Sequence, residues 1–219
     1  MQTSDLTRLK PEQKDPRIDR WIEFLSAAIL ALAVIGTAWC GYQAARWGGK
    51  QAESFIEALA AQQNSIQKAN QAVLVQSLHV DLFVEWASAV SQEDQQLADF
   101  LFELFPPKLK GATDAWLTLE PETNSNAPPS PFVMPEYILE QSEESEKLSI
   151  EADEFFEQAT RANLTSDNYV LLTVIFASVL FFGGISGKFQ SRVIDLTMLI
   201  LAFVLFTVGV TVMLGYPVH

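Results

Sequence analysis

The sequence has too few cysteines and histidines for several common kinds of site. Its single cysteine, Cys40, has no second thiol in the chain with which to form a disulfide. Its two histidines, His79 and His219, stand in no recognisable triad arrangement for nucleophilic catalysis. We therefore expect no enzymatic activity, no catalytic residue and no cofactor.

Metal ligation is not indicated either. His79, Asp81 and Glu85 lie close together in the sequence, but on a helix the two acids share a face that the histidine does not. The Glu-x-x-His pairs that build di-metal sites in helical bundles are missing from the sequence. We expect no metal ion.

Positive charge is scarce. The chain contains 14 Lys and Arg against 27 Asp and Glu, a net charge of −13. Residues 43–168 hold 21 of the acids and only seven of the basic residues. Such a surface attracts cations and repels nucleic acid, whose phosphates need a basic footprint. It is either a cation-concentrating vestibule or a solvated face with no task beyond solubility.

Apolar residues concentrate in three runs, although the mean hydropathy of the whole chain is only +0.15. The runs cover residues 24–41, 169–185 and 196–214. Because about 20 helical residues cross a bilayer core, these runs predict transmembrane helices at residues 21–42, 169–187 and 194–216. The expected fold class is an all-α integral membrane protein, with the lipid bilayer as a partner.

Basic residues beside the runs predict the orientation, because Lys and Arg are retained on the cytoplasmic side. Lys188 and Arg192 lie in the short connection at residues 188–193. The N-terminal segment, residues 1–20, carries Arg8, Lys10, Lys14, Arg17 and Arg20. Both segments are predicted to be cytoplasmic, which places residues 43–168 and the C-terminal residues 217–219 outside.

The outer segment is predicted to be a helical bundle continuous with the membrane helices. An amphipathic pattern continues the first span through Ala52, Phe55, Ile56, Leu59, Ile66 and Val73. A second pattern ends at Pro106 and Pro107, and a third helix begins with Pro135 in its first turn. Between them, residues 106–135 form a Pro-rich loop. Its aromatic and apolar side chains predict a contact surface made of Trp116, Phe132, Met134 and Tyr137.

Small residues recur every four positions along the first span and its exit. They are Ala33, Thr37, Gly41, Ala45 and Gly49. This spacing lets membrane helices approach closely, so it predicts a helix-packing interface. The partner is either another span of this chain or the same helix of a neighbouring subunit, and the length of the row favours a homo-oligomer.

An aromatic and basic collar follows the first span. Trp39, Tyr42, Arg46 and Trp47 are typical of side chains that anchor a helix at the membrane interface. An alternative interpretation places Tyr42, Gln43 and Arg46 around the mouth of an oligomeric pore. Near the third span, Asp195 is predicted to cap the helix in its first turn, three residues after Arg192.

Three stretches carry a resemblance: "AWCGYQAARWGGKQAE", "PPSPFVMPEY" and "SDNYVLLTVIFASVLFFGGI". With them the chain resembles a group of uncharacterised bacterial three-span inner-membrane proteins, over most of residues 20–216. The resemblance implies a bacterial inner-membrane location and the same order of basic start, anchor, acidic helical segment, Pro-rich loop and two final spans. It implies no activity and no site residues.

Three functions remain open from the sequence, the third being a sensor subunit, which would need a cytoplasmic output partner. The first is a non-enzymatic, self-associating, multi-pass membrane protein whose outer helical domain is an interaction or accessory module, with another membrane protein as its partner. The alternative is a homo-oligomeric cation channel with an acidic outer vestibule.

Overall fold

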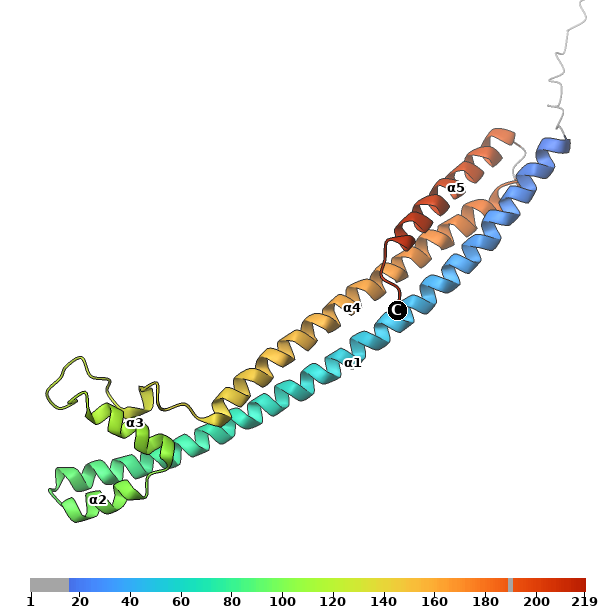
Figure 1. Ribbon diagram of the computed structural model, residues 1–219. Helices are drawn as coiled ribbons and strands as arrows, with labels where there is room; N and C mark the ends of the chain where they lie inside the picture. Colours follow the sequence, from blue (N-terminus) through green and yellow to red (C-terminus); the bar gives the residue numbers. More distant parts are fainter. Residues whose placement is uncertain (1–15, 189–190) are drawn as a thin grey trace, which may run out of the picture. The chain divides into compact units, whose positions relative to one another are not determined.

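The computed structural model describes residues 16–188 and 191–219, and within them every regular element is helical (Figure 1). The elements are α1 (Pro16–Ser91), α2 (Gln95–Glu103), α3 (Pro107–Leu117), the 3₁₀ turn η1 (Pro131–Val133), α4 (Glu140–Ile185) and α5 (Arg192–Leu214). Three of them, α1, α4 and α5, are long and apolar enough to cross a membrane. The all-α prediction with three such helices is confirmed. Residues 1–15 of the predicted basic N-terminus and residues 189–190 of the predicted connection lie outside the described residues.

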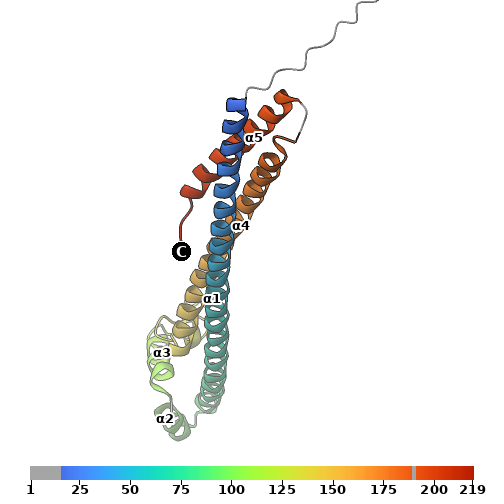
Figure 2. The same ribbon diagram turned by 90° about the vertical axis from the view of Figure 1, so that its right-hand side faces the viewer.

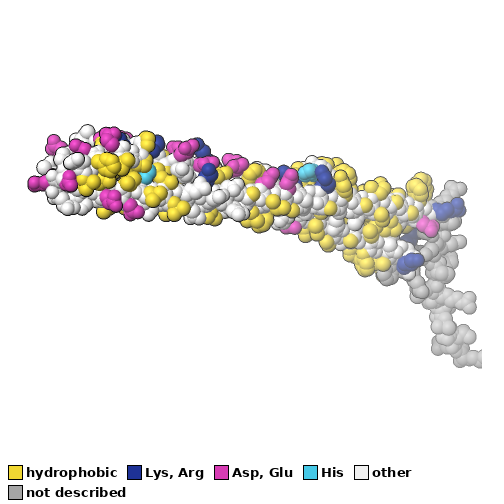
Figure 3. All heavy atoms as spheres, turned by 90° about the horizontal axis from the view of Figure 1, so that it is seen from below, with side chains coloured by type: hydrophobic (Ala, Val, Ile, Leu, Met, Phe, Trp, Pro, Cys, Tyr) yellow, Lys and Arg dark blue, Asp and Glu magenta, His cyan; other side chains and the backbone are white. Residues whose placement is uncertain are grey.

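The chain divides into two compact units. We call the described residues up to Ala52 together with residues 160–219 the apolar unit, and residues 53–159 the acidic unit. The names follow their composition: the acidic unit contains 20 Asp and Glu against four Lys and Arg, whereas the visible face of the apolar unit is mainly hydrophobic (Figure 3).

Three helices pack together in the apolar unit, where α1, α4 and α5 run beside one another in both ribbon views (Figures 1 and 2). The buried residues of α1 recur at alternating intervals of three and four, the repeat by which one helix face stays against a partner. They are Ile29, Ala33, Gly36, Cys40 and Gln43. From α4 come Tyr169, Leu172, Phe176 and Val179, and from α5 Leu199 and Ala202.

Phe176 lies at the centre of this packing. A Cβ atom added to Gly36 of α1 would come within 2.9 Å of the Phe176 ring, and one added to Gly209 of α5 within 3.3 Å. The ring is fully buried. Two glycines on two helices therefore make the space that one aromatic side chain of the third helix fills.

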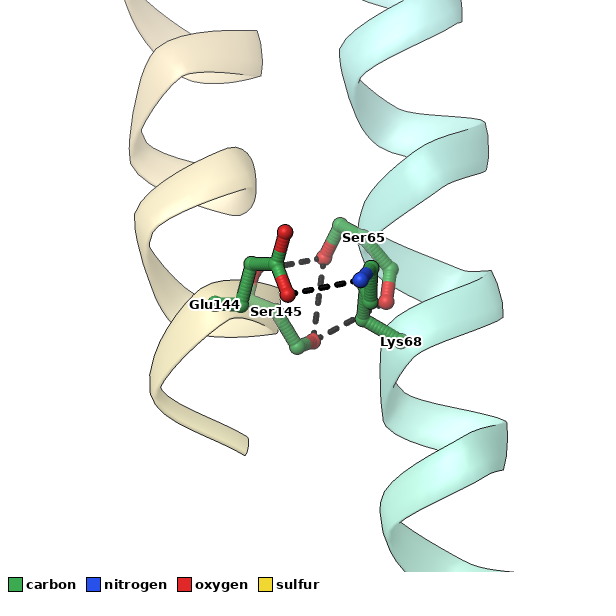
Figure 4. Close-up of polar contacts among 4 residues, drawn as sticks. All are labelled: Ser65, Lys68, Glu144 and Ser145. Carbon is green, nitrogen blue, oxygen red and sulfur yellow. Dashed lines mark hydrogen bonds and ion pairs between the residues drawn. The ribbon is translucent and has the colours of Figure 1, made fainter. Parts of the chain in front are cut away.

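Short hydroxyl side chains connect α1 to α4 in both units. In the apolar unit, Ser26 Oγ donates to the carbonyl of Gly183 at 3.1 Å, and Ser166 Oγ donates to that of Ala44 at 2.9 Å. In the acidic unit, the hydroxyls of Ser65 and Ser145 each donate to the other's backbone carbonyl, at 2.8 and 3.0 Å (Figure 4). A serine reaches a neighbouring backbone only where two helices approach closely.

The α1–α4 contact of the acidic unit is made of small residues. The buried positions of α1 in this contact are Ser54, Ala58, Ala61 and Ser65, and those of α4 include Ala152 and Ala159. The larger apolar side chains that predicted the amphipathic helix lie on other faces: Leu59, Ile66 and Val73 are each about half exposed or more. The predicted helix is present, but its buried face is the small-residue face.

The end of the acidic unit differs from the sequence prediction in three places. The chain turns after Ser91, where Asp94 caps α2 by accepting the backbone N–H of Leu97 at 3.1 Å. Pro107 then begins the helix α3 instead of only ending the preceding one, because proline at the first helical position has no N–H to leave unpaired. Pro135 precedes α4, which begins at Glu140.

Enlarging Gly36 is expected to disrupt the apolar unit. A Gly36→Leu side chain would enter the space of the buried Phe176 ring, and overpacking of this kind costs about 1–3 kcal/mol of stability. The measurement is the thermal unfolding midpoint of the detergent-purified protein by circular dichroism. Gly184→Leu is the matched control, because nothing lies within 4 Å of its added Cβ and it lies outside the predicted small-residue interface. Equal midpoints for the two variants would contradict this packing.

Candidate functional site

The predicted loop contact residues lie against the core of the acidic unit. Met134 and Tyr137 are buried, with 9% and 8% of their surface exposed, and Phe132 and Trp116 are partly buried beside them. Phe132 makes edge-on contacts with Phe83 of α1 and with Tyr137, at ring-centroid distances of 5.5 and 5.1 Å. These side chains hold the segment in place, and Trp116 also lines a cavity.

His79 and Tyr137 form a buried polar pair. The His79 Nδ1 atom lies 2.9 Å from the Tyr137 hydroxyl, and the tautomer of the histidine decides which group donates the hydrogen bond. Burial lowers the pKa of His79 below its ordinary value and raises the pKa of Tyr137 to about 12. Both groups are therefore neutral near pH 7, which suits a structural hydrogen bond.

Asp81 and Glu85 line the same shallow hollow as His79, but both are exposed. Among the described residues, no three His, Cys, Asp or Glu side chains come together in a group that could hold a metal ion.

A cavity of about 590 Å³ opens at the end of the acidic unit. On one side it is lined by α1 residues that include Phe83 and Trp86. On the other it is lined by Trp116, Glu120 and Glu122, from α3 and the turn that follows it. The sequence interpretation placed Trp116 in a contact surface but did not connect it with Trp86, Glu120 or Glu122. These residues become neighbours only when α3 folds back against α1.

The predicted small-residue interface divides between two environments. Ala33 is buried against the other helices of the apolar unit, and the Thr37 hydroxyl donates to the Ala33 carbonyl at 2.8 Å. Gly41, Ala45 and Gly49 are exposed, and nothing described lies within 4 Å of a Cβ added to either glycine. The row drifts around the helix, away from the face that α4 and α5 cover.

Two of the four predicted anchors, Arg46 and Trp47, lie beside the C-terminal segment. Trp47 Nε1 donates to the Pro217 carbonyl at 3.1 Å, and an Arg46 Nη lies 3.3 Å from the His219 Nδ1. Trp39 and Tyr42 are exposed and contact each other at 5.9 Å between ring centroids. The contacts of Arg46 with His219 and of Trp47 with Pro217 were not predicted, because the partners lie more than 165 positions apart in the sequence.

Gln43 lies on the buried face of α1 in the apolar unit. Its side chain is completely buried, and its Oε1 atom accepts the backbone N–H of His219 at 3.0 Å. The Tyr169 hydroxyl also donates to the Pro217 carbonyl, at 3.2 Å. These contacts give Gln43 a role in holding the C-terminal segment, whereas the alternative interpretation placed it at the mouth of a pore.

Asp195 holds the connection between α4 and α5. It lies in the first turn of α5, as predicted, and its Oδ1 atom accepts the backbone N–H of Gly187 at 2.9 Å. Gly187 has a φ of +85°, a left-handed conformation that glycine adopts without steric cost. The Asp195 carboxylate, which belongs to α5, thus fixes the turn at Gly187 that precedes this helix.

No protein-family model, curated protein or solved structure matches the chain.

Acidification is expected to destabilise the acidic unit through His79. Because the folded state lowers the pKa of His79, the unfolded chain binds more protons, so the free energy of unfolding falls as the pH drops below about 6.5. The measurement is chemical unfolding at about pH 7.5 and about pH 5.5, compared between the natural chain and a His79→Gln variant.

Every other titratable group is present in both proteins, so the difference between them reports His79. The variant should show the smaller loss of stability on acidification. An identical loss would mean that His79 does not contribute.

Proposed function

We propose that this chain is a non-enzymatic, multi-pass membrane protein of the bacterial inner membrane that assembles into a homo-oligomer. Its acidic unit is the interaction module of the assembly. One observation carries the self-association: a long, apolar and nearly uncharged face of α1 is exposed in the acidic unit.

Insertion into a membrane is supported by the surface of the apolar unit. Large side chains on all three long helices are exposed, among them Ile35 of α1, Phe181 of α4 and Val204 of α5. Such a surface is costly in water and favourable in a bilayer. The basic residues beside the spans favour a cytoplasmic N-terminus, and this puts the acidic unit and the C-terminus outside.

The exposed face of α1 has the repeat of a helix that packs against other helices. Leu59, Ile66 and Val73 are seven residues apart, and 49, 52 and 63% of their surface is exposed. Residues 58–80 contain a single charged side chain, Lys68, which pairs with Glu144 of α4 at 2.6 Å (Figure 4). Heptad spacing of apolar residues is typical of helices that associate in coiled coils.

Charge favours a second copy of the chain as the occupant of this face. Residues 140–157 of α4 contain eight Asp and Glu, so two copies that met through α4 would place like charges against each other. Two copies that meet through α1 avoid this repulsion and cover the apolar side chains. The exposed residues Gly41 and Ala45 would allow close packing of the same helix within the first span.

Carboxylates on the α1 face are expected to dissociate the oligomer. In a Leu59→Glu and Ile66→Glu double variant, two apolar side chains are lost from the contact, and burial of each contributes about 1.5–3 kcal/mol. The dissociation constant should rise by about 100-fold or more. The measurement is the subunit number of the detergent-purified protein by native mass spectrometry.

Ile150→Glu is the matched control, because Ile150 is an exposed apolar residue on the acidic helix α4. It should leave the subunit number unchanged. A natural chain that is monomeric, or a double variant with the natural subunit number, would contradict the proposal.

The alternative function is a homo-oligomeric cation channel with an acidic outer vestibule. The excess of Asp and Glu in residues 53–159 supports it, since such a surface concentrates cations. Against it stand Arg46, which opposes cations near the outer collar, and Gln43, whose side chain is buried within its own subunit.

The subunit number also separates the two functions. A central pore needs a closed ring, so an assembly of four or more subunits that conducts potassium in a liposome flux assay would favour the channel. A dimer would leave the interaction module as the better interpretation. Gly41→Leu adds a sensitive variant, because it meets nothing within 4 Å of its Cβ in its own subunit and would act only between subunits.

A further inference from the structure

The cavity at the end of the acidic unit has an aromatic lining that is fixed in place. Phe83 contacts Trp86 and Trp116 at ring-centroid distances of 5.4 and 5.7 Å. Trp116 Nε1 donates a 2.7 Å hydrogen bond to the Pro128 carbonyl, which orients its ring. Three aromatic rings from two helices therefore surround a space of a size typical of small-molecule sites.

The rim of the cavity is acidic. Glu120 and Glu122 line it, and none of the other lining residues is a Lys or an Arg. Glu120 adopts a left-handed backbone conformation with a φ of 50°, which is uncommon for a residue other than glycine. The turn is held by hydrogen bonds from the backbone N–H groups of Thr123 and Asn124 to the Glu120 carbonyl, at 3.0 and 2.9 Å. The Thr123 hydroxyl also donates to Glu120 Oε2, at 3.3 Å.

Aromatic faces and carboxylates together select one class of ligand. The face of an indole ring attracts cations, and it does so best when the cation carries methyl or methylene groups that are weakly hydrated. A strongly hydrated metal ion needs several oxygen ligands at once, which two exposed carboxylates on a turn do not supply. A neutral apolar molecule would fit the rings but gain nothing from the acidic rim.

We infer that this cavity binds small organic cations, in particular those with a quaternary ammonium group. The cation lies against Trp86 and Trp116, and Glu120 and Glu122 neutralise its charge from the rim. The acidic unit as a whole favours the approach of such a ligand, because its excess of Asp and Glu attracts positive charge. The site is independent of the proposed self-association.

The test compares two ligands of the same shape. Choline and 3,3-dimethyl-1-butanol differ in the central atom, a charged nitrogen in one and a neutral carbon in the other. Isothermal titration calorimetry of the full-length protein, in a detergent with a sugar headgroup, measures both. We expect choline to bind at least about tenfold more tightly than the alcohol. Equal binding of the two, or no binding of choline, would overturn the inference.

Variants locate the site. A Glu120→Gln and Glu122→Gln double variant should weaken choline binding by about tenfold or more, and Trp116→Ala should abolish it. The charge control is a Glu136→Gln and Glu140→Gln double variant, which removes the same charge from exposed positions outside the cavity. An equal loss in the two double variants would show nonspecific attraction to an acidic protein.

A third arm tests the source of the cation. Binding of glycerophosphocholine, the soluble headgroup of phosphatidylcholine, without binding of free choline would assign the ammonium group to a lipid and overturn the inference of a small soluble ligand. Because the double variants change only exposed carboxylates, their folding is expected to be unaffected, and circular dichroism checks it.

Discussion

Close approach of α1 and α4 is the constraint on which both units depend. In the acidic unit the buried side chains of the α1–α4 contact are small, and in both units serine hydroxyls reach the carbonyls of the other helix. A leucine at Ala58 or Ala152 would separate the backbones and break these hydrogen bonds. The small residues thus determine the spacing, and the spacing determines which polar contacts can form.

The same constraint explains why so many large apolar residues are exposed. Small side chains occupy the α1–α4 contact of the acidic unit, so Leu59, Ile66 and Val73 have no place in it. In the apolar unit, a bilayer would cover the exposed leucines, isoleucines and phenylalanines. In the acidic unit the proposed second copy of the chain would cover them, and the scarcity of charge on this face of α1 favours that copy as the partner.

The sequence was sufficient for the helical class and for the three apolar helices, because composition and run length alone decide these features. It misled us about which face of α1 is buried, since Leu59 and Ile66 look like core residues while Ala58 and Ser65 look neutral. Only the presence of α4 distinguishes the two faces. The turn at Asp94 and the start of α3 at Pro107 had readable local signals, namely an N-cap residue and a proline at the first helical position.

The candidate sites were harder to predict because they depend on contacts between distant residues. Trp86 and Trp116 line one cavity only after two turns fold α3 back, and no periodicity links them. The contacts of Gln43 and Trp47 with residues 217–219 join residues that lie still farther apart in the sequence. Isolated residues of these sites were conspicuous in the sequence, but their partners were not.

The separation of the contacting residues also bears on biosynthesis. Ser26 is separated from its acceptor, the Gly183 carbonyl, by 157 residues. At about 5–20 residues per second, a ribosome needs roughly 8–30 s to synthesise the intervening chain. In the proposed topology the first span waits in the bilayer throughout this time, with Ser26 not yet bonded to α4 and Gln43 not yet bonded to His219. A membrane chaperone or a neighbouring nascent chain would meet that polar face first.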